Sequence, residues 1–483
     1  MLSGVDRCNQ YADDVLSGKI LAPLTIKQAS RRYIKDFENP KFYFDSRAAD
    51  VAVRNIERMR HAKGRWQGQK IVLEPWQCFA IVNLFGWKLT RNNLRRFRKF
   101  YFRIPRKNGK STLGIFIALL MFGPDMEKGA EVYLGATSQE QANDLLFYPA
   151  KYIVEQDKKF IRRFGIEVNA QNLVIPGNFS KLKAVIKKPA DGTNPHCAIV
   201  DEYHEHEDSE QYDTFETGNG AREQPLLGVT TTAGSNLAGP CKTMDDECLA
   251  LLDGDHEDDS MFALIYAPDE ADRWDDINTW LKVNPNVGVT FEREYLEDKL
   301  EQAIRSPEKQ NGLRTKHVNE WVGAATAWMN ILIWQKQSRP KMFEEFEGCR
   351  AMGAVDLSTR NDANALSLLF KNDRGQYFHR PTFYASEKAV RGNLKYQAYK
   401  NSGELIVTLG NKTDQSRIED DILEFSERFE VLKWGFDDFQ GDYIMARCMD
   451  QGLEVLNYGA TVKNFSAPMK EVDVLTDDGE LFN

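Results

Sequence analysis

Short apolar runs, each followed by a polar turn and a helical stretch, recur between residues 100 and 250. The runs are "KFYFRIP", "AEVYLGAT", "NLVIP", "CAIVDE" and "PLLGVTTTAGS". Strands that alternate with helices in this way predict a parallel sheet covered on both faces. Ser138, with Gln141 three residues later, is typical of a capping box at the start of a helix. This part of the chain is therefore expected to be an α/β domain.

A second strand and helix pattern begins at residue 349 and differs from the first. The runs "CRAMGAVDLS" and "ALSLLFKNDRGQYFHRPTFYA" predict three strands, with the turn "KNDRGQ" closing a hairpin. A helix is expected at "SRIEDDILEFSERFE", a strand at "LKWGFDDF", a helix at "DYIMARCMDQG" and a strand at "LEVLNYG". We therefore expect two α/β domains of different topology.

The other segments lack this alternation and divide the chain further. Residues 1–70 are charged and helical, and residues 251–330 are mostly helical and acidic. The predicted organisation is a helical segment at 1–70, an α/β core at 71–250, a helical lid or subdomain at 251–330, a linker at 331–348 and a second α/β domain at 349–483.

Composition restricts the class of protein without defining it. The chain has 483 residues and a formal net charge of -9, which argues against a protein that coats nucleic acid with its whole surface. Its longest apolar run, Leu113 to Gly123, is too short to cross a bilayer, and the N-terminus lacks a secretory signal pattern. The cysteines are scattered without a C-x-x-C pair, which favours reduced thiols over a zinc ribbon. A cytoplasmic protein without membrane contact is expected.

Positive charge is concentrated between Arg91 and Lys110, where no acidic residue occurs. The cations are Arg91, Arg95, Arg96, Arg98, Lys99, Arg103, Arg106, Lys107 and Lys110. Two interpretations stay open at this point. The stretch could be a solvated helix face that leads into a strand, or it could contact phosphate or DNA.

The segment "PRKNGKST" has the chemistry of a phosphate-binding loop, or P-loop. Such a loop needs backbone N–H groups around the phosphate, a lysine that reaches the β and γ phosphates, and a hydroxyl group on Mg²⁺. The residues expected to bind the nucleotide here are Arg106, Lys107, Asn108, Gly109, Lys110, Ser111 and Thr112. The helix that follows would present its positive end to the anion. The motif alone is weak, because Ile104 stands where the pattern requires its first glycine.

An acidic pair strengthens this interpretation. Asp201 and Glu202 end the apolar strand "CAIVDE", about 90 residues after the lysine. Asp201 is expected to hold Mg²⁺ through water, and Glu202 to orient and deprotonate the attacking water. An ordinary solvated turn would be the alternative for such a pair in isolation. In this strand, loop and helix setting, ATP hydrolysis with Lys110 and Arg106 at the site is the better hypothesis.

Two flanking segments complete the predicted nucleotide site. "EPWQ" offers Gln77, whose amide can pair with an adenine edge, and Trp76, which could pack near the base. "GVTTTAGS" places Thr230, Thr231 and Thr232 at a strand end, where small hydroxyl residues are suited to sensing the γ-phosphate. These threonines are expected to couple hydrolysis to movement.

The segments "EPWQ", "PRKNGKST", "CAIVDEYHEH", "GVTTTAGS", "WLKVNPNVG" and "RTKHVNEWVG", in this order, resemble the large terminase subunit of tailed bacteriophages, of the HK97-like type. The resemblance covers the chain from about residue 70 to its end. It implies a RecA/ASCE-like P-loop ATPase followed by a ribonuclease H-like nuclease. It also implies that a basic P-loop is the family form and that Arg106 is an arginine finger acting in cis. From the sequence alone Arg106 could equally contact phosphate or DNA.

The same resemblance implies the partners and the cellular setting. A terminase of this kind hydrolyses ATP to drive double-stranded DNA into the procapsid, and it cuts the concatemer with a metal-dependent endonuclease. Its implied partners are the portal protein, the procapsid, the small terminase subunit and other copies of itself, in a pentameric ring. Its implied location is the host cytoplasm, with transient binding to the procapsid.

The second α/β domain carries acids where a two-metal nuclease needs them. Asp356 ends the strand "AMGAVDLS" and Asp437 ends "LKWGFDDF". If these strands are parallel neighbours, both side chains reach one sheet edge and could bind two Mg²⁺ or Mn²⁺ ions. Asp438 is expected to point to the opposite face, because side chains alternate along a strand, so only one of the pair should bind metal. The resemblance implies Asp437, because "FDDF" is similar to the family's aromatic-Asp-x-aromatic segment.

A third acidic ligand is implied by the resemblance, beyond the segment "SAPMK". This chain ends at "GELFN" before reaching it, so either Asp473, Asp477 or Asp478 substitutes, or the metal site is incomplete. Weak or absent cutting, with ATP hydrolysis retained, is the resulting expectation.

Two other functions are compatible with parts of the pattern. A helicase or restriction-type translocase shares the P-loop and the acidic pair, but this chain lacks a second RecA-like repeat. A portal-associated structural adaptor with a degenerate nucleotide site is the alternative outside the enzymes.

Overall fold

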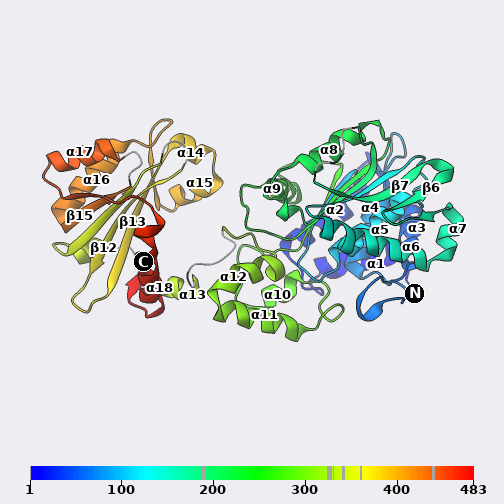
Figure 1. Ribbon diagram of the computed structural model, residues 1–483, viewed down its shortest axis with the longest axis horizontal. Helices are drawn as coiled ribbons and strands as arrows, with labels where there is room; N and C mark the ends of the chain where they lie inside the picture. The colour runs from blue at the N-terminus through cyan, green and yellow to red at the C-terminus, as the bar shows by residue number, and fades with distance from the viewer. Residues whose placement is uncertain are drawn as a thin grey trace. The chain divides into compact units, whose positions relative to one another are not determined.

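The computed structural model describes residues 2–187, 189, 192–323, 329, 331–339, 343–358, 362–437 and 441–483. The chain divides into two compact units, Met1–Ala327 and Trp328–Asn483, each with its own hydrophobic core. Figure 1 shows the elements of both units. Among the described residues, no helix has the length and apolar character needed to cross a membrane.

The first unit is built on an eight-stranded sheet. Its strands in spatial order are β10 (Met261–Ile265), β3 (Lys99–Arg103), β9 (Leu226–Thr231), β8 (Pro195–Asp201), β4 (Glu131–Ala136), β7 (Ser180–Ile186), β6 (Asn172–Ile175) and β5 (Glu167–Val168). The six strands from β10 to β7 run parallel, and β6 and β5 form an antiparallel edge. The prediction of an α/β domain with a parallel sheet is confirmed.

Helices surround this sheet on its faces and edges. They are α1 (Gly4–Leu16), α2 (Leu24–Lys35), α3 (Ser46–Glu57), α4 (Pro75–Gly86), α5 (Lys110–Phe122), α6 (Tyr148–Gln156), α7 (Lys158–Phe164), α8 (Glu210–Gly218), α9 (Pro240–Asp253), α10 (Ile277–Val283), α11 (Arg293–Arg305) and α12 (Pro307–Leu313). Short elements join them: η1 (Asp36–Glu38), η2 (Gly64–Trp66), η3 (Gln141–Phe147), η4 (Pro176–Asn178), η5 (Tyr203–Glu205), η6 (Asn219–Ala221), η7 (Arg314–Val318) and the hairpin β1 (Phe42–Phe44) with β2 (Trp87–Leu89).

Two details of this unit differ from the sequence prediction. The "NLVIP" run forms β6, which is antiparallel to β7 rather than part of the parallel set. The segment 251–330, expected to be mostly helical, contributes β10, which pairs in parallel with β3. The run "MFALI" is short and lies between acidic loops, so its pattern alone does not separate a strand from a helix. Half of the predicted capping box is present: Gln141 N donates to Ser138 Oγ over 3.2 Å, but the Gln141 side chain bonds to Thr137 and Glu205 instead of the Ser138 backbone.

Helix α5 carries the phosphate-loop lysine and is held in the centre of the unit. Its side chains from Leu113 to Phe122 are buried almost without exception, as expected for a helix that is apolar on all sides. A Cβ at Gly114 would lie 3.1 Å from Ile199 Cγ2 on β8, so the glycine allows close helix and strand packing. This packing sets the lysine at the helix start against the end of β8.

The basic stretch before the P-loop is largely neutralised inside the fold. Arg95 Nη1 lies 3.0 Å from Asp125 Oδ1, and Arg96 Nη1 lies 2.6 Å from Asp36 Oδ2. Arg103 Nε lies 3.1 Å from Asp245 Oδ1, and all three guanidinium groups are buried. Lys99 pairs with Glu216. For the three arginines neither sequence interpretation applies, because their charges are used in internal ion pairs, whereas the Lys99–Glu216 pair is partly exposed.

Replacing Arg96 with alanine is expected to lower the free energy of unfolding by about 3–5 kcal/mol, because Asp36 would be left as a buried, unpaired carboxylate. The guanidinium group also packs 3.7 Å from the ring centroid of Phe42, and these contacts would be lost. Thermal unfolding followed by circular dichroism measures the change. Arg91→Ala, at an exposed position, is the control and should stay within about 0.5 kcal/mol. A loss below about 1 kcal/mol for Arg96→Ala would contradict the prediction.

The second unit is built on a seven-stranded mixed sheet. Its strands in order are β14 (Leu405–Thr408), β13 (Tyr377–Ser386), β12 (Asn364–Lys371), β11 (Arg350–Asp356), β15 (Glu430–Phe436) and β16 (Val455–Asn457), with β17 (Leu481–Phe482) paired to β13. The β11, β12 and β13 strands are antiparallel neighbours, whereas β15 runs parallel to β11 and β16 parallel to β15. The hairpin turn lies where the sequence predicts it, with Gly375 N donating to Asn372 O over 3.0 Å.

The helices of this unit are α13 (Ile331–Lys336), η8 (Phe343–Phe346), α14 (Glu387–Arg391), α15 (Leu394–Asn401), α16 (Gln415–Arg428), α17 (Asp442–Asp450) and α18 (Val462–Asp477). Figure 1 shows α16 and α17 beside β15, and α14 and α15 at the other side of the sheet. The predicted order of three strands, helix, strand, helix and strand is present, but β14 and the α14–α15 pair are inserted before α16. Part of the predicted linker belongs to the core, because Phe346 stacks on Phe370 with centroids 4.5 Å apart.

Candidate functional site

The predicted P-loop forms the turn between β3 and α5. Gly109 precedes the first helical residue with φ 83°, a left-handed conformation that suits glycine. Asn108 is buried, and its side-chain amide donates to Pro105 O over 3.2 Å and to Arg106 O over 3.1 Å. The side chain of Asn108 therefore fixes the turn, and helix α5 begins directly after it.

Lys110 and Glu202 meet across this loop. Lys110 Nζ donates to Glu202 Oε1 over 2.8 Å, and the lysine is only 6% exposed. Glu202 follows β8 in a left-handed conformation, with φ 50°, and its N–H donates to Thr230 O over 2.7 Å. The structure thus brings together Lys110 and Glu202, which the sequence predicts to bind ATP and to activate the attacking water.

Asp201 is the buried partner of this pair. Its Oδ1 accepts a 2.5 Å hydrogen bond from Thr230 Oγ1, and Ser111 also hydrogen-bonds to the carboxylate. Burial and the neighbouring Glu202 raise the pKa of Asp201 to about 6, against the opposing effect of Lys110. A carboxylate and a hydroxyl converging beside a lysine are hard oxygen ligands of the kind that Mg²⁺ prefers. The residues present therefore fit the ion that the P-loop implies.

The surroundings of Glu202 keep its carboxylate ionised and leave one oxygen unengaged. Burial favours its protonated form, but the Lys110 ammonium and His204 hold the pKa of Glu202 below its ordinary value. Its second oxygen, Oε2, is buried without a hydrogen bond from the described residues, and His204 Nδ1 lies 3.4 Å away. An ionised carboxylate with one oxygen unengaged is the arrangement that a general base requires.

The predicted threonine segment lies next to these acids. Thr230, Thr231 and Thr232 are all fully buried at the end of β9. Thr231 Oγ1 accepts from His204 N over 3.0 Å and lies 3.1 Å from His204 Nδ1. The main chain then continues to Ala233, whose N–H donates to Asn319 Oδ1 over 2.7 Å. A contact path of buried polar groups therefore joins Glu202, the threonines and the segment "RTKHVNEWVG".

Residues of the helical lid form hydrogen bonds with the P-loop that the local sequence pattern does not predict. Asn108 Nδ2 donates to Asn284 Oδ1 over 2.7 Å, while Asn286 N donates to Asn108 Oδ1 over 3.0 Å. Asn286 Nδ2 also donates to Asn108 O over 2.9 Å. Both lid asparagines come from "WLKVNPNVG". Two asparagines around a proline were the available signal, but their partner is more than 170 residues away in the chain.

Asn108→Ala is expected to lower kcat/KM for ATP about tenfold. The substitution leaves buried polar groups of Asn284 and Asn286 unpaired, which costs about 1–3 kcal/mol and loosens the lid on the P-loop. Steady-state phosphate release measures the effect. Asn169→Ala, at an exposed hairpin position, is the control, and equal rates for both variants would speak against a positioning role for Asn108.

The two residues predicted to bind the base, Gln77 and Trp76, have different surroundings in the structure. Gln77 lines a cavity of about 250 Å³ together with Gly109 and Thr112. Trp76, in contrast, is only 2% exposed and is not among the residues that line this cavity; its indole N–H donates to Asn286 Oδ1 over 2.7 Å. Trp76 therefore lies in the core behind the site, where it supports the lid.

The two cations of the loop also take separate positions. Arg106 is partly exposed, with Nη2 4.0 Å from Glu205 Oε1, and its N–H donates to Lys316 O over 2.8 Å. Lys107 has φ 68°, and its carbonyl accepts from Thr290 Oγ1 over 2.7 Å. The loop backbone is thus tied to the lid, while the Arg106 guanidinium remains near the acidic side of the site.

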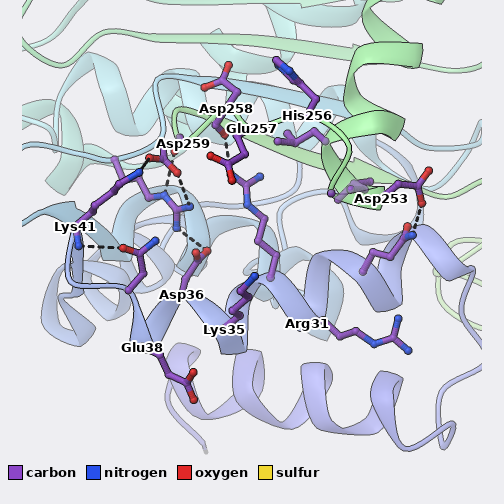
Figure 2. Close-up of a pocket in the computed structure, with 17 residues that line it drawn as sticks. Arg31, Lys35, Asp36, Glu38, Lys41, Asp253, His256, Glu257, Asp258 and Asp259 are labelled. Atoms are coloured by element: carbon purple, nitrogen blue, oxygen red, sulfur yellow. Dashed lines mark hydrogen bonds and ion pairs between the residues drawn. The ribbon is translucent and has the colours of Figure 1, made fainter.

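A larger cavity, of about 800 Å³, lies elsewhere in this unit, between α2 and the loop that joins α9 to β10. Figure 2 shows that its walls are densely charged, and several of the charges are paired. Lys41 Nζ lies 3.0 Å from Asp259 Oδ2, and Arg32 donates to the carbonyl oxygens of Asp258 and Met261. None of the predicted site residues lines this cavity, so its size does not make it the functional site.

The predicted nuclease acids lie at one edge of the second sheet. Asp356 ends β11, Asp437 directly follows β15, and the preceding residues Val355 and Phe436 are register partners in this parallel pair. Asp356 is exposed, and Asp437 Oδ1 accepts from Ala460 N over 3.1 Å. Two carboxylates at adjacent strand ends fit part of a divalent-cation site. Asp438 lies outside the described residues.

The candidates for a third nuclease ligand lie far from this edge. Asp473 and Asp477 belong to the last part of α18, and Asp478 follows it. The chain then forms β17, where Leu481 pairs with Tyr377 at the start of β13. Asp356 is level with Phe383, toward the other end of β13 and about 20 Å from Tyr377 along the strand. Substitution by these three acids is therefore not supported, and the described residues contain no group of three acids, histidines or cysteines that could hold a metal.

Comparison with known proteins gives the class of the chain. The family model of the terminase large subunit ATPase domain matches residues 75–248, and the model of the terminase large subunit endonuclease domain matches residues 255–482. The chain belongs to the terminase large subunit family, and it is an enzyme with ATPase and endonuclease domains that acts as a DNA-packaging motor. Membership in this family decides against the helicase and structural-adaptor alternatives.

The chain is also similar to individual proteins. The chain is 33% identical over 307 residues to Protein YmfN of Escherichia coli (strain K12), covering 61% of this chain and 68% of that protein. It is 26% identical over 436 residues to the terminase large subunit of Enterobacteria phage HK97, covering 87% and 82%. The crystal structure of the HK97 bacteriophage large terminase matches with 23% identity and a TM-score of 0.49, covering 90% of each chain.

Proposed function

We propose that this terminase subunit hydrolyses ATP at the site formed by the P-loop, Asp201 and Glu202. Lys110 and the loop residues from Arg106 to Thr112 bind the phosphates, and Ser111 with Asp201 holds Mg²⁺. Bound there, Mg²⁺ would neutralise charge on the phosphate oxygens. Glu202 takes the proton of the attacking water, and Arg106 acts as the arginine finger. The observation that carries the proposal is the 2.8 Å contact between Lys110 and Glu202 beside buried Asp201.

Coupling to movement is assigned to the threonines and the lid. Thr230 binds Asp201 directly, and Thr231 contacts His204 next to the base. A change at Glu202 can therefore be transmitted through β9 to Asn319 and to the lid segment 251–330. This path supports a motor in which hydrolysis moves the lid against the core.

The second unit is proposed to cut DNA at the edge marked by Asp356 and Asp437. Divalent ions held there, Mg²⁺ or Mn²⁺, would activate water and stabilise the leaving oxygen. The parallel pairing of β11 with β15, which sets both carboxylates at one edge, supports the assignment. The proposed domain bounds are 1–70, 71–250, 251–330, 331–348 and 349–483, except that β10 joins the core sheet of the first unit and Phe346 joins the core of the second.

The assembly in which this enzyme works is proposed from its family. Its partners are double-stranded DNA, the portal protein and procapsid, the small terminase subunit and further copies of this chain in a pentameric ring. The place of action is the host cytoplasm, at the procapsid.

The direct test is ATP hydrolysis by the purified full chain, with and without double-stranded DNA and empty procapsids. Hydrolysis stimulated by DNA and procapsids, and lost in Lys110→Ala, is expected. Phosphate release that is the same in wild type and in Lys110→Ala would overturn the proposed nucleotide site.

A further inference from the structure

A cavity of about 460 Å³ lies at the carboxyl edge of the first sheet. Its walls come from Thr137 and Lys187, which directly follow β4 and β7, and from the segment that joins β8 to α8 together with the first turn of that helix. These three strands are neighbours in the sheet. None of the residues predicted to bind or hydrolyse the nucleotide lines this cavity, so it is separate from the proposed ATP site.

Acids outnumber cations on the walls of this cavity. Glu205, Asp208 and Glu210 contribute carboxylates, and Lys187 contributes a positive charge. Glu205 is held in place, because its Oε2 accepts from Gln141 Nε2 over 2.6 Å. Asp208 Oδ1 accepts from Glu210 N over 3.0 Å at the start of α8. Fixed carboxylates in a concave site favour a cationic ligand.

His206 adds a buried hydrogen-bond acceptor to this lining. The residue is only 8% exposed, and its Nε2 has no hydrogen-bond partner among the described residues. The ring also hydrogen-bonds to the Asp201 backbone, and this bond is made by Nδ1 because Nε2 is unengaged. Burial lowers the pKa of His206, so the neutral ring donates through Nδ1 and keeps a lone pair on Nε2. A ligand N–H group would satisfy this buried acceptor.

The chemistry of the lining favours one kind of cation over another. A metal ion needs several convergent ligands, and the part of the chain that the structure describes has no group of three acids, histidines or cysteines that could hold one. A guanidinium or ammonium group has several N–H donors, which suit carboxylates spread around one imidazole nitrogen. The cavity volume also leaves room for an aliphatic chain that carries such a group.

We propose that this cavity binds an organic cation with N–H donors, a guanidinium or primary ammonium group, which donates to His206 Nε2 while Glu205 and Asp208 neutralise its charge. The inference goes beyond the proposed ATP site, because it adds a second ligand in a separate cavity. Glu205 Oε1 also lies 4.0 Å from Arg106 Nη2, so the cation and the P-loop share one carboxylate. The cation belongs either to a small polyamine in solution or to a lysine or arginine side chain of a second copy of this chain.

The test is calorimetric titration of the full chain with hexamethylenediamine, and with hexamethonium, which has the same chain and charge but no N–H donors. Saturable binding of the diamine, at least about tenfold tighter than that of hexamethonium, is expected because the diamine alone can donate to His206 Nε2. His206→Phe and Asp208→Asn should each weaken diamine binding about tenfold. Asp298→Asn, the same change at an exposed position of α11, is the control and should stay within about twofold.

Sedimentation velocity at increasing protein concentration, without diamine, distinguishes the two sources of the cation. Self-association that is lost in Asp208→Asn and retained in Asp298→Asn would identify a side chain of a second copy. A chain that stays monomeric and binds the diamine would identify a small molecule from solution. Either result supports the site.

Three outcomes would overturn the proposal. They are equal affinity for the diamine and hexamethonium, diamine binding that is unchanged in His206→Phe and Asp208→Asn, and the absence of both saturable diamine binding and self-association sensitive to Asp208→Asn. If His206→Phe does not fold, Asp208→Asn decides alone, because an asparagine at this position can still accept from Glu210 N.

Discussion

Glu202→Gln is expected to reduce ATP hydrolysis by about 10²–10⁴-fold while leaving ATP binding largely unchanged. The amide keeps the shape and polarity of the side chain but cannot accept a proton from water. Lys110 would lose its anionic partner at 2.8 Å, yet the phosphates of ATP would replace that partner. Phosphate release in the presence of DNA and empty procapsids measures the first quantity, and calorimetric titration with Mg·ATP measures the second.

Glu207→Gln is the matched control for this change. Glu207 is exposed, lies five residues further along the chain, and does not contact the P-loop lysine in the described structure. Its variant should hydrolyse ATP at close to the wild-type rate. Hydrolysis by Glu202→Gln within about threefold of wild type would remove Glu202 from the role of general base.

Metal-dependent DNA cleavage by this chain is expected to be weak, because Asp356 and Asp437 form only part of a divalent-cation site. Asp356→Asn should remove the cleavage that remains, because the amide is a poor ligand for a hard divalent cation. ATP hydrolysis should continue at the wild-type rate. Asp356 belongs to the second unit, whose core is separate from that of the unit containing the P-loop. Plasmid degradation in Mg²⁺ or Mn²⁺, followed on agarose gels beside a phosphate-release assay, reads out both activities.

Glu430→Gln provides the comparison for the nuclease experiment. Glu430 begins β15 and Asp437 directly follows it, so the two acids mark opposite ends of one strand. A metal site at the Asp437 end predicts that Glu430→Gln cuts as wild type does. Cutting that survives Asp356→Asn but is lost in Glu430→Gln would contradict the proposal, because it would place the cleavage site at the Glu430 end of β15.

The nucleotide-binding edge was predictable because its residues occupy strand ends and one short loop. The carboxyl ends of parallel strands lie at one edge of the sheet, so Lys110, Asp201 and Thr230 were expected close together at that edge once the strands were identified. The same reasoning placed Asp356 beside Asp437. Both predictions used the local sequence and the topology that follows from alternating strands and helices, and the choice of Asp437 over Asp438 also used the family resemblance.

Contacts between distant segments were not predictable in this way. Arg95, Arg96 and Arg103 read as a basic surface, because their partners Asp125, Asp36 and Asp245 lie in other helices and loops. Trp76 was expected near the base, but helix α4 turns it into the core, and Trp66 faces the cavity instead. Nothing in a local pattern specifies which tryptophan of two neighbouring segments faces a ligand.

If Lys110 binds the phosphates and Glu202 is the base, as proposed, their hydrogen bond couples nucleotide binding to activation of the base. A lysine ammonium cannot remain fully engaged with a carboxylate while it also binds two phosphate groups. With the proposed roles, a nucleotide that draws Lys110 toward its phosphates would release Glu202 to act on water. The base would then be restrained until its substrate had bound.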